Sequence, residues 1–220
     1  IANSKFIARR IMKLYKREAA VIYPPVSVDR FSIGMEKEDF YITVSRLVSY
    51  KKVDMIVRAF NQLPDRKLIV IGDGPELKSL KKIASSNTTF MGFQPEAVIE
   101  DMLKRARAFL YAAEEDFGIV PVEAQACGTP VIAYGKGGVL ETIVPGETGI
   151  FFDEQSDTGL IEAIRNFERS PAFDPEVIRQ NAERFNKARF LREMAAFVEE
   201  KSADFFGSNY NPSDVLAGYK

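Results

Sequence analysis

The chain has 220 residues, of which 46% are hydrophobic and 28% are charged, and its formal net charge at pH 7 is −1. This composition is typical of a globular domain with one core, and the near-zero charge gives no basic field that would attract nucleic acid. The sequence has no histidine and one cysteine, Cys127, which excludes an internal disulfide, histidine-based acid–base chemistry and a zinc site in this chain. We interpret Cys127 as a buried residue at a helix end. No apolar run approaches the ~18 residues that a membrane helix needs.

The first part of the chain differs in pattern from the rest. Residues 4–16 have apolar residues at helical spacing, and Ser4 is suited to cap that helix at its N-terminus. The helix is basic, and we weigh two interpretations of its charge: a solvated face, which is the simpler one, and contact with an anionic membrane surface. Residues 23–26 contain two prolines and read as a stiff linker. A processed chain or an excised piece would explain the start at Ile1, without a methionine.

From residue 40 onward, apolar strand-like segments alternate with helical segments. This alternation predicts an α/β fold of Rossmann-like type, a parallel sheet with helices on both faces. The carboxyl ends of parallel strands meet at one edge of the sheet, where ligands bind in such folds. Residues 207–220 are expected to form a loose tail. The predicted strands are 40–44, 67–71, 88–91, 108–111, 131–134 and 149–152, and the predicted helices are 53–63, 76–84, 96–106, 119–126, 139–143, 160–167, 175–185 and 187–205.

The most informative segment is residues 114–133. Glu115 and Glu123 are separated by seven residues, and Gly118 lies between them, directly before an apolar helical run. Gly128 stands where that helix would end. A helix that begins at a glycine-bearing loop presents free N–H groups and the positive end of its dipole, which together favour phosphate. A nucleotide sugar could then contact both carboxylates, one through its sugar hydroxyls and the other through its ribose.

This segment resembles the E-x7-E motif of retaining GT-B glycosyltransferases of family 4, the glycosyl transferases group 1 type. Further segments are similar to motifs of that family, except that Lys52 stands where the family usually has glycine, which leaves open whether Lys51 or Lys52 has the family role. The resemblance covers residues 3 to about 197 and looks most like bacterial polysaccharide mannosyltransferases. It implies the C-terminal, donor-binding half of such an enzyme. The matching segments are residues 45–52, 71–76, 90–92 and 137–141.

The resemblance also implies a division of the chain. Residues 1–27 would be the end of an N-terminal domain and the linker that follows it. Residues 28–185 would form the nucleotide-sugar binding domain, and residues 186–220 a helix that crosses back to the N-terminal domain together with the loose tail.

The resemblance makes Arg46 and Lys51, which both follow the first strand of the sheet, the predicted catalytic cations. A leaving diphosphate gains negative charge as the sugar–oxygen bond breaks, and fixed cations stabilise that charge. We therefore expect neither a required metal nor a cofactor besides the donor. Without the resemblance, a solvated basic edge would be the preferred interpretation of these two residues.

The other site residues are assigned roles through the resemblance. Glu115 would hold hydroxyls of the transferred sugar and is counted with the catalytic residues, while Glu123 would accept hydrogen bonds from the ribose. Glu141 is expected to cap or brace the helix that follows it. Taken from the sequence alone, the pair Gly72 and Gly74 could equally be a tight turn. The remaining predicted contacts to the donor come from Gly72, Gly74, Met91, Phe117, Gly118, Ile119 and Val120.

The function that follows is transfer of a hexose from a nucleoside-diphosphate sugar to a saccharide or lipid-linked acceptor in polysaccharide biosynthesis. GDP-mannose is the favoured donor, and a UDP-sugar is the alternative. The acceptor would bind through the missing N-terminal domain, so the fragment alone is expected to bind nucleotide without turnover. Two other hypotheses stay open: a non-catalytic nucleotide-sugar binding module and a GT-B nucleotide-sugar epimerase. The resemblance implies a cytoplasmic protein, with the inner face of the membrane as the place of any peripheral contact.

Overall fold

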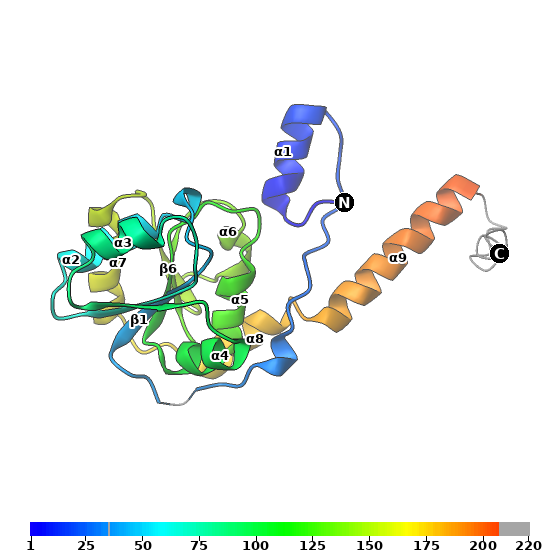
Figure 1. Ribbon diagram of the computed structural model, residues 1–220. Coiled ribbons are helices and arrows are strands. Elements are labelled where there is room, and N and C mark those ends of the chain that lie inside the picture. The colour runs from blue at the N-terminus through cyan, green and yellow to red at the C-terminus, as the bar shows by residue number, and fades with distance from the viewer. Residues whose placement is uncertain (35, 207–220) are drawn as a thin grey trace.

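Six strands form one fully parallel sheet in the order β3-β2-β1-β4-β5-β6 (Figure 1). The structure, a computed structural model, describes residues 1–34 and 36–206, so the predicted tail lies outside the described residues. The predicted α/β fold is confirmed, and each predicted strand is present to within one residue. The strands are β1 Phe40–Val44, β2 Lys67–Ile71, β3 Thr88–Gly92, β4 Ala108–Tyr111, β5 Val131–Tyr134 and β6 Gly149–Phe152.

Helices cover both faces of the sheet. Successive strand residues point to opposite sides, and in the central strands the residues on both sides are buried. Along β4, Phe109 packs in the core cluster that includes residues of α4, α5 and α8, whereas Leu110 packs in the cluster that includes residues of α2, α3 and α7. The helices are α1 Lys5–Tyr15, α2 Val53–Asn61, α3 Leu77–Ile83, α4 Glu96–Arg105, α5 Ile119–Ala126, α6 Val139–Thr142, α7 Asp157–Arg169, α8 Pro175–Glu183 and α9 Lys187–Phe206, with 3-10 turns η1 Val28–Arg30 and η2 Ser49–Lys51.

Local capping explains where several helices begin and end. The Ser4 hydroxyl accepts the backbone N–H of Ile7 at 3.1 Å, as its predicted capping role requires. The Ser156 hydroxyl accepts the N–H of Gly159 in the same way, so α7 begins at 157 rather than at the predicted 160. Helix α5 ends before Gly128, whose φ of 69° suits glycine at a helix C-terminus.

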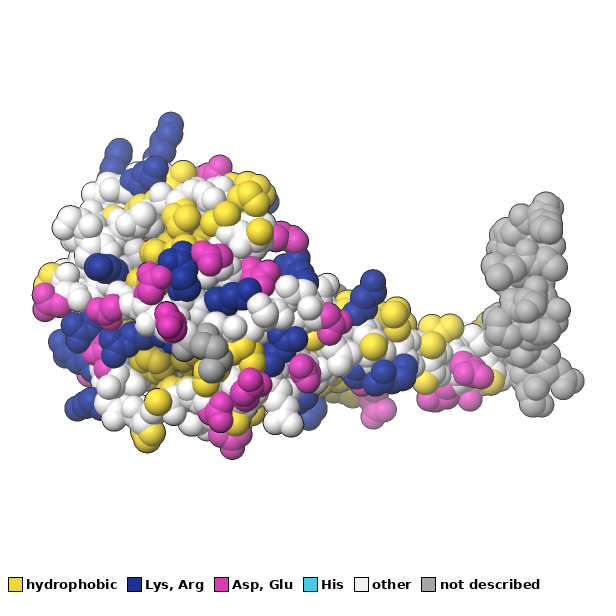
Figure 2. Space-filling model, turned by 90° about the horizontal axis from the view of Figure 1, so that it is seen from below, with side chains coloured by type: hydrophobic (Ala, Val, Ile, Leu, Met, Phe, Trp, Pro, Cys, Tyr) yellow, Lys and Arg dark blue, Asp and Glu magenta, His cyan; other side chains and the backbone are white. Residues whose placement is uncertain are grey.

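Helices α1 and α9 stand apart from the sheet and its covering layers (Figure 1). No residue of α1 is buried, and a short parallel bridge between Ala2 and Val21 joins the chain on its two sides. Figure 2 shows α9 as an arm that extends from the domain, and the face in view carries positive and negative side chains intermixed. No helix within the described ranges is long and apolar enough to cross a bilayer. The predicted division into residues 1–27, 28–185 and 186–220 stays a prediction.

Candidate functional site

The strand order fixes where a ligand crevice can form. After β1 the sheet continues outward through β2 and β3, whereas β4 lies on the other side of β1 and leads to β5 and β6. The loops that follow β1 and β4 therefore run in opposite directions and leave a crevice between them at the carboxyl edge of the sheet. The first of these loops contains Lys51, and the second contains Glu115 and Gly118.

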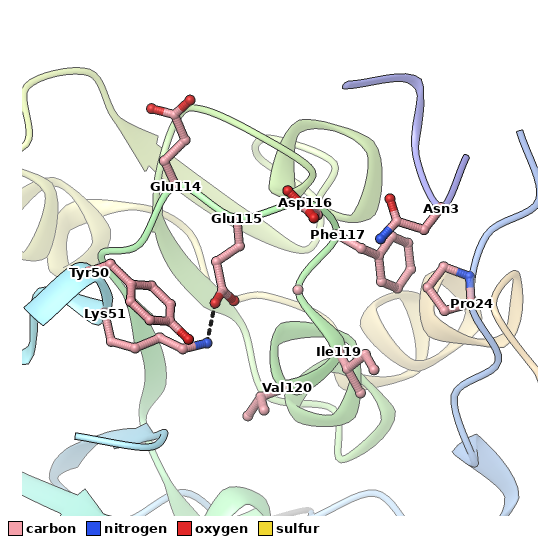
Figure 3. Close-up of a pocket in the computed structure, with 11 residues that line it drawn as sticks. Asn3, Pro24, Tyr50, Lys51, Glu114, Glu115, Asp116, Phe117, Ile119 and Val120 are labelled. Atoms are coloured by element: carbon pink, nitrogen blue, oxygen red, sulfur yellow. Dashed lines mark hydrogen bonds and ion pairs between the residues drawn. The ribbon is translucent and has the colours of Figure 1, made fainter. Parts of the chain in front are cut away.

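A cleft of about 550 Å³ occupies this position (Figure 3). Tyr50 and Lys51 lie on one side of it, Glu115 reaches across from the loop after β4, and Ile119 and Val120 mark the start of α5. Asn3, which precedes α1, and Pro24 of the predicted linker form a further wall. The sequence did not predict this wall. The lining residues are Asn3, Pro24, Tyr50, Lys51, Glu114, Glu115, Asp116, Phe117, Gly118, Ile119 and Val120.

The Lys51 ammonium and the Glu115 carboxylate form an ion pair across the crevice (Figure 3). Both side chains are mostly shielded from solvent, with exposed fractions of 18% and 21%. The Tyr111 hydroxyl donates a hydrogen bond to the second carboxylate oxygen of Glu115. The structure thus brings together a predicted phosphate-binding cation and a predicted sugar-binding acid, and it places Lys51 rather than Lys52 in this cleft.

The start of α5 forms the third part of the cleft. Gly118 precedes the helix with φ of 89° and ψ of 80°, a conformation that favours glycine. No side chain caps this helix N-terminus. The first N–H groups of the helix, including those of Ile119 and Val120, are therefore available to an anion and reinforced by the helix dipole.

Two further glycines allow the loop after β5 to approach Glu115. The Gly138 N–H donates to the Glu115 carbonyl at 2.7 Å, and Gly137 forms a bridge with the same residue. A Cβ atom on Gly138 would overlap the backbone of Asp116 and Phe117. The position of the Glu115 loop therefore depends on the absence of side chains at 137 and 138.

Gly72 and Gly74 connect the loops after β1 and β2. A Cβ atom on Gly72 would overlap the Ser45 carbonyl, and one on Gly74 would overlap the Leu47 carbonyl. These close approaches account for both glycines, and neither residue lines the cleft. The exposed Arg46 lies in the same pair of loops, outside the cleft lining, and its side chain has no partner among the residues described. The donor contacts assigned to these three residues stay predictions.

Glu123 lies further along α5 and is held by a cation that the sequence did not predict. Arg30 of η1 contacts Glu123 at 3.1 Å and Glu96 at 2.5 Å. Burial raises the pKa of the Glu123 carboxyl, and the nearby Arg30 opposes that shift. Met91 is at the end of β3, and its carbonyl accepts a hydrogen bond from the Gln94 amide at 2.6 Å. Neither Glu123 nor Met91 lines the cleft at Lys51.

The prediction for Glu141 was wrong. Its carboxylate does not cap the following helix but accepts the backbone N–H groups of Lys5 and Phe6 at 2.8 and 2.9 Å, at the start of α1. The unpaired N–H groups of a first helical turn need acceptors, and Glu141 provides two. The Tyr23 hydroxyl also donates to it at 2.9 Å. Burial and this contact raise the pKa of Tyr23 to about 12.

The side chains at the cleft offer acceptors, cations and amide donors. Within residues 1–34 and 36–206 there is no group of three or more acidic or cysteine side chains placed to hold a metal ion. The arrangement can hold a polar ligand that carries both an anionic group, beside Lys51 and the start of α5, and hydroxyl groups, beside Glu115.

Comparison with known proteins finds relatives that are named as glycosyltransferases. The GDP-mannose-dependent alpha-(1-6)-phosphatidylinositol monomannoside mannosyltransferase of Mycolicibacterium smegmatis is 28% identical over 199 residues, which cover 76% of this chain and 52% of the relative. The D-inositol 3-phosphate glycosyltransferase of Mycobacterium sp. (strain JLS) is 30% identical over 181 residues, which cover 70% of this chain and 40% of the relative. The chain thus spans about half the length of these curated relatives or less.

Solved structures share the fold. Sucrose-phosphate synthase from Thermosynechococcus elongatus superposes with a TM-score of 0.80 at 22% identity, covering 92% of this chain and 58% of that one. Anabaena HepE in complex with UDP-glucose gives a TM-score of 0.78 at 21% identity, covering 90% and 63%. These likenesses establish the Rossmann-like fold of one half of a GT-B glycosyltransferase. The family model described as glycosyl transferases group 1 matches residues 26–185, and the chain belongs to this family.

Proposed function

We propose that this chain is the donor-binding half of a retaining glycosyltransferase that transfers a hexose from a nucleoside-diphosphate sugar. The observation that carries the proposal is the Lys51–Glu115 ion pair, which spans the crevice between β1 and β4 beside the uncapped start of α5. A nucleotide sugar has the matching groups in the matching order, a diphosphate joined directly to a hydroxyl-rich ring.

In this proposal the diphosphate lies against Lys51 and the N–H groups of Ile119 and Val120, with Arg46 as a second cation. Glu115 turns from Lys51 to the hydroxyls of the transferred sugar. The acceptor oxygen forms a bond to the anomeric carbon on the face from which the diphosphate departs. The diphosphate leaves with the electron pair of the broken bond and takes the acceptor proton. The protein contributes positioning and charge stabilisation rather than a nucleophile.

GDP-mannose is the favoured donor, with transfer to a saccharide or lipid-linked acceptor in polysaccharide biosynthesis. The name of the mycobacterial relative, which includes GDP-mannose dependence, supports this donor. HepE was solved with UDP-glucose, so a UDP-sugar is the natural competitor in any test. The acceptor site and the remaining catalytic groups are expected on an N-terminal half. The proposed location is cytoplasmic.

Calorimetric titration with GDP, UDP and ADP tests the proposal. We expect at least one nucleotide to bind wild type, and Lys51→Ala to weaken that binding about tenfold or more, because a charge-assisted hydrogen bond to phosphate is lost. Lys78→Ala removes the same charge from an exposed position on α3, outside the cleft lining, and should leave the affinity unchanged. The donor site is refuted if none of the three nucleotides binds, or if the two variants bind alike.

A further inference from the structure

A second hollow, of about 440 Å³, adjoins the cleft. The two share Tyr50 and Glu114, so a molecule in the second hollow would lie directly beside one in the first. The hollow lies where α1 faces the loop after β1, and its walls come from four separate parts of the chain. Its lining residues are Phe6, Arg10, Ser49, Tyr50, Lys52, Glu114 and Gln155.

The backbone at Lys52 makes this lysine unusual. Its φ of 56° and ψ of 31° lie in the left-handed region, where L-residues with a Cβ are strained and glycine is not. Lys52 ends η2, where its N–H donates to the Ser49 carbonyl, and it precedes the first residue of α2. Glycine would adopt this backbone conformation without strain. Glycine at position 52 would therefore keep this backbone and remove only the side chain, which makes Lys52→Gly a clean probe of what the side chain binds.

The lining of the hollow has the chemistry of a site for an anionic sugar. Arg10 and Lys52 bring two cations from different elements, against the single acid Glu114. Across the described part of the chain, Lys52 has no ion-pair partner, and the ion pair of Arg10 with the exposed Asp116 is long, 3.5 Å. The Arg10 guanidinium also lies over the ring of Phe6, at 5.8 Å from its centroid. Such exposed pairs are weak and can be exchanged for a ligand.

The uncharged lining residues suit a sugar ring. Tyr50 is 60% exposed, and the Lys51 ammonium lies over its ring at 5.5 Å from the centroid. The exposed part of the ring can pack against the C–H face of a saccharide. Ser49 supplies a hydroxyl. The Gln155 amide nitrogen donates to the Ala112 carbonyl at 2.8 Å, which fixes the side chain and leaves its carbonyl oxygen as an acceptor.

We propose that this hollow binds an anionic saccharide as the acceptor of the transfer, with Lys52 and Arg10 holding its carboxylate or phosphate and Tyr50 holding its ring. The inference rests on the proposed function, because the neighbouring cleft must hold the donor. It assigns part of the acceptor site to this chain, whereas the sequence alone had placed the acceptor entirely on an N-terminal half.

The test is a titration of the isotope-labelled chain, saturated with the nucleotide that binds best, followed by NMR. The probes are glucose 1-phosphate, glucuronate, methyl glucoside and inorganic phosphate. We expect the two anionic sugars to shift the amide signals of Ser49, Tyr50 and Lys52, and to bind more tightly than methyl glucoside. The tighter of the two identifies phosphate or carboxylate as the recognised group.

Lys52→Gly should weaken binding of the anionic sugars about fivefold, since one charged contact is lost. Its matched control is Lys16→Gly. Lys16 is the only other non-glycine residue with positive φ in the described part of the chain, at 54°, and it follows the far end of α1. Both variants remove one charge and relieve the same backbone strain, so both should fold at least as stably as wild type, and Lys16→Gly should bind like wild type.

Three results would overturn the inference: equal weakening by both variants, equal affinity for methyl glucoside and the anionic sugars, or inorganic phosphate binding as tightly as glucose 1-phosphate. The nucleotide titration separates this outcome from failure of the proposed function. Nucleotide binding that is retained while the sugars fail to bind contradicts the acceptor site alone. Absence of nucleotide binding contradicts the donor site on which the inference rests.

Discussion

Two glutamates, Glu168 and Glu115, receive the same kinds of partner at opposite edges of the sheet. Glu168 on α7 accepts the Tyr41 hydroxyl at 2.9 Å and two hydrogen bonds from Arg66, at 2.6 and 2.8 Å. Arg66 directly precedes β2, so this cluster lies at the amino edge. Glu115, at the carboxyl edge, accepts the Tyr111 hydroxyl and pairs with Lys51. Each carboxylate thus has one tyrosine and at least one cation.

The geometry of the cation distinguishes the two glutamates. Arg66 grips both oxygens of Glu168 with a planar, pre-organised group, and Arg107 adds charge at 3.7 Å. Lys51 makes a single contact from a flexible stem beside a cleft of about 550 Å³. Glu168 also borders a hollow, of about 310 Å³, but both of its oxygens are held by Arg66. A bidentate pair of this kind fixes a helix to a sheet, whereas a single ammonium contact beside a cavity can be exchanged for a ligand. We therefore expect Glu168 to govern stability and Glu115 to govern binding.

The largest expected effect is on folding. Glu168→Gln should lower the free energy of unfolding by about 2 kcal/mol, because Arg66 and Arg107 lose their shared carboxylate. That change corresponds to a melting temperature lower by about 4–8 °C for a domain of this size. Glu115→Gln should cost less than about 1 kcal/mol. Urea denaturation of both variants measures the difference in free energy of unfolding. Equal losses for the two variants would contradict the assignment of Glu168 to stability and Glu115 to binding.

The stability that Glu168 contributes should depend on pH. The Arg66 hydrogen bonds, foremost, hold the pKa of Glu168 below its ordinary value of 4.5. A carboxyl with a lowered folded-state pKa contributes stability that is complete above about pH 4.5 and is lost as pH falls through the folded value. The stability difference between wild type and Glu168→Gln should be constant from about pH 7 to 5 and shrink by about 1–2 kcal/mol below that range. A difference that persists unchanged at pH 3 would show that the carboxylate charge is not its source.

A smaller effect is expected from the two tyrosine hydroxyls. Tyr41→Phe should destabilise the protein by about 1 kcal/mol, and Tyr111→Phe by about half of that. The reason is that Glu115 has the larger exposed fraction, 21% against 13% for Glu168, so water can replace the lost hydroxyl more readily. Thermal melts of the two phenylalanine variants give the comparison directly. A larger loss of stability for Tyr111→Phe than for Tyr41→Phe would contradict the prediction that the amino edge contributes more to stability.

The smallest effect concerns ligand exchange at Glu115. Glu115→Gln should tighten binding of a nucleoside diphosphate without sugar about threefold, because Lys51 loses its competing carboxylate. The same variant should weaken binding of the nucleotide sugar, which needs the acid for its hydroxyls. Glu147→Gln is the matched control, since Glu147 is exposed and lines neither the cleft nor the neighbouring hollow. Calorimetry with both ligands decides the matter, and parallel changes for the two ligands would contradict the exchange.

The sheet could be predicted because its signals are local. Each strand is a short apolar run bounded by turn residues, and the boundaries agreed to within one residue. The start of α7 was missed because residues 157–159 contain no apolar residue, and the Ser156 cap that begins the helix has no hydrophobic signature. The positions of α1 and α9 relative to the sheet depend on distant contacts, which no local pattern encodes.

The site was predicted in part for the same reason. Lys51, Glu115 and Gly118 follow parallel strands, so their convergence follows from topology. Arg30 was missed because its partner Glu123 is 93 positions away, and no local pattern encodes that pair. Tyr111 was predicted only as the last residue of a strand, and its hydroxyl bond to Glu115 depends on the turn that follows β4.

A short mechanical linkage joins helix α1 to the acid in the cleft. The Glu115 carbonyl holds Gly138, a residue at the start of α6, and Glu141 in the same helix holds the first amides of α1. The path consists of a backbone hydrogen bond at one end of a single helical turn and of the Glu141 side chain at the other. We therefore expect a partner that binds and displaces α1 to shift the backbone at Glu115 and, with it, the position of the bound sugar.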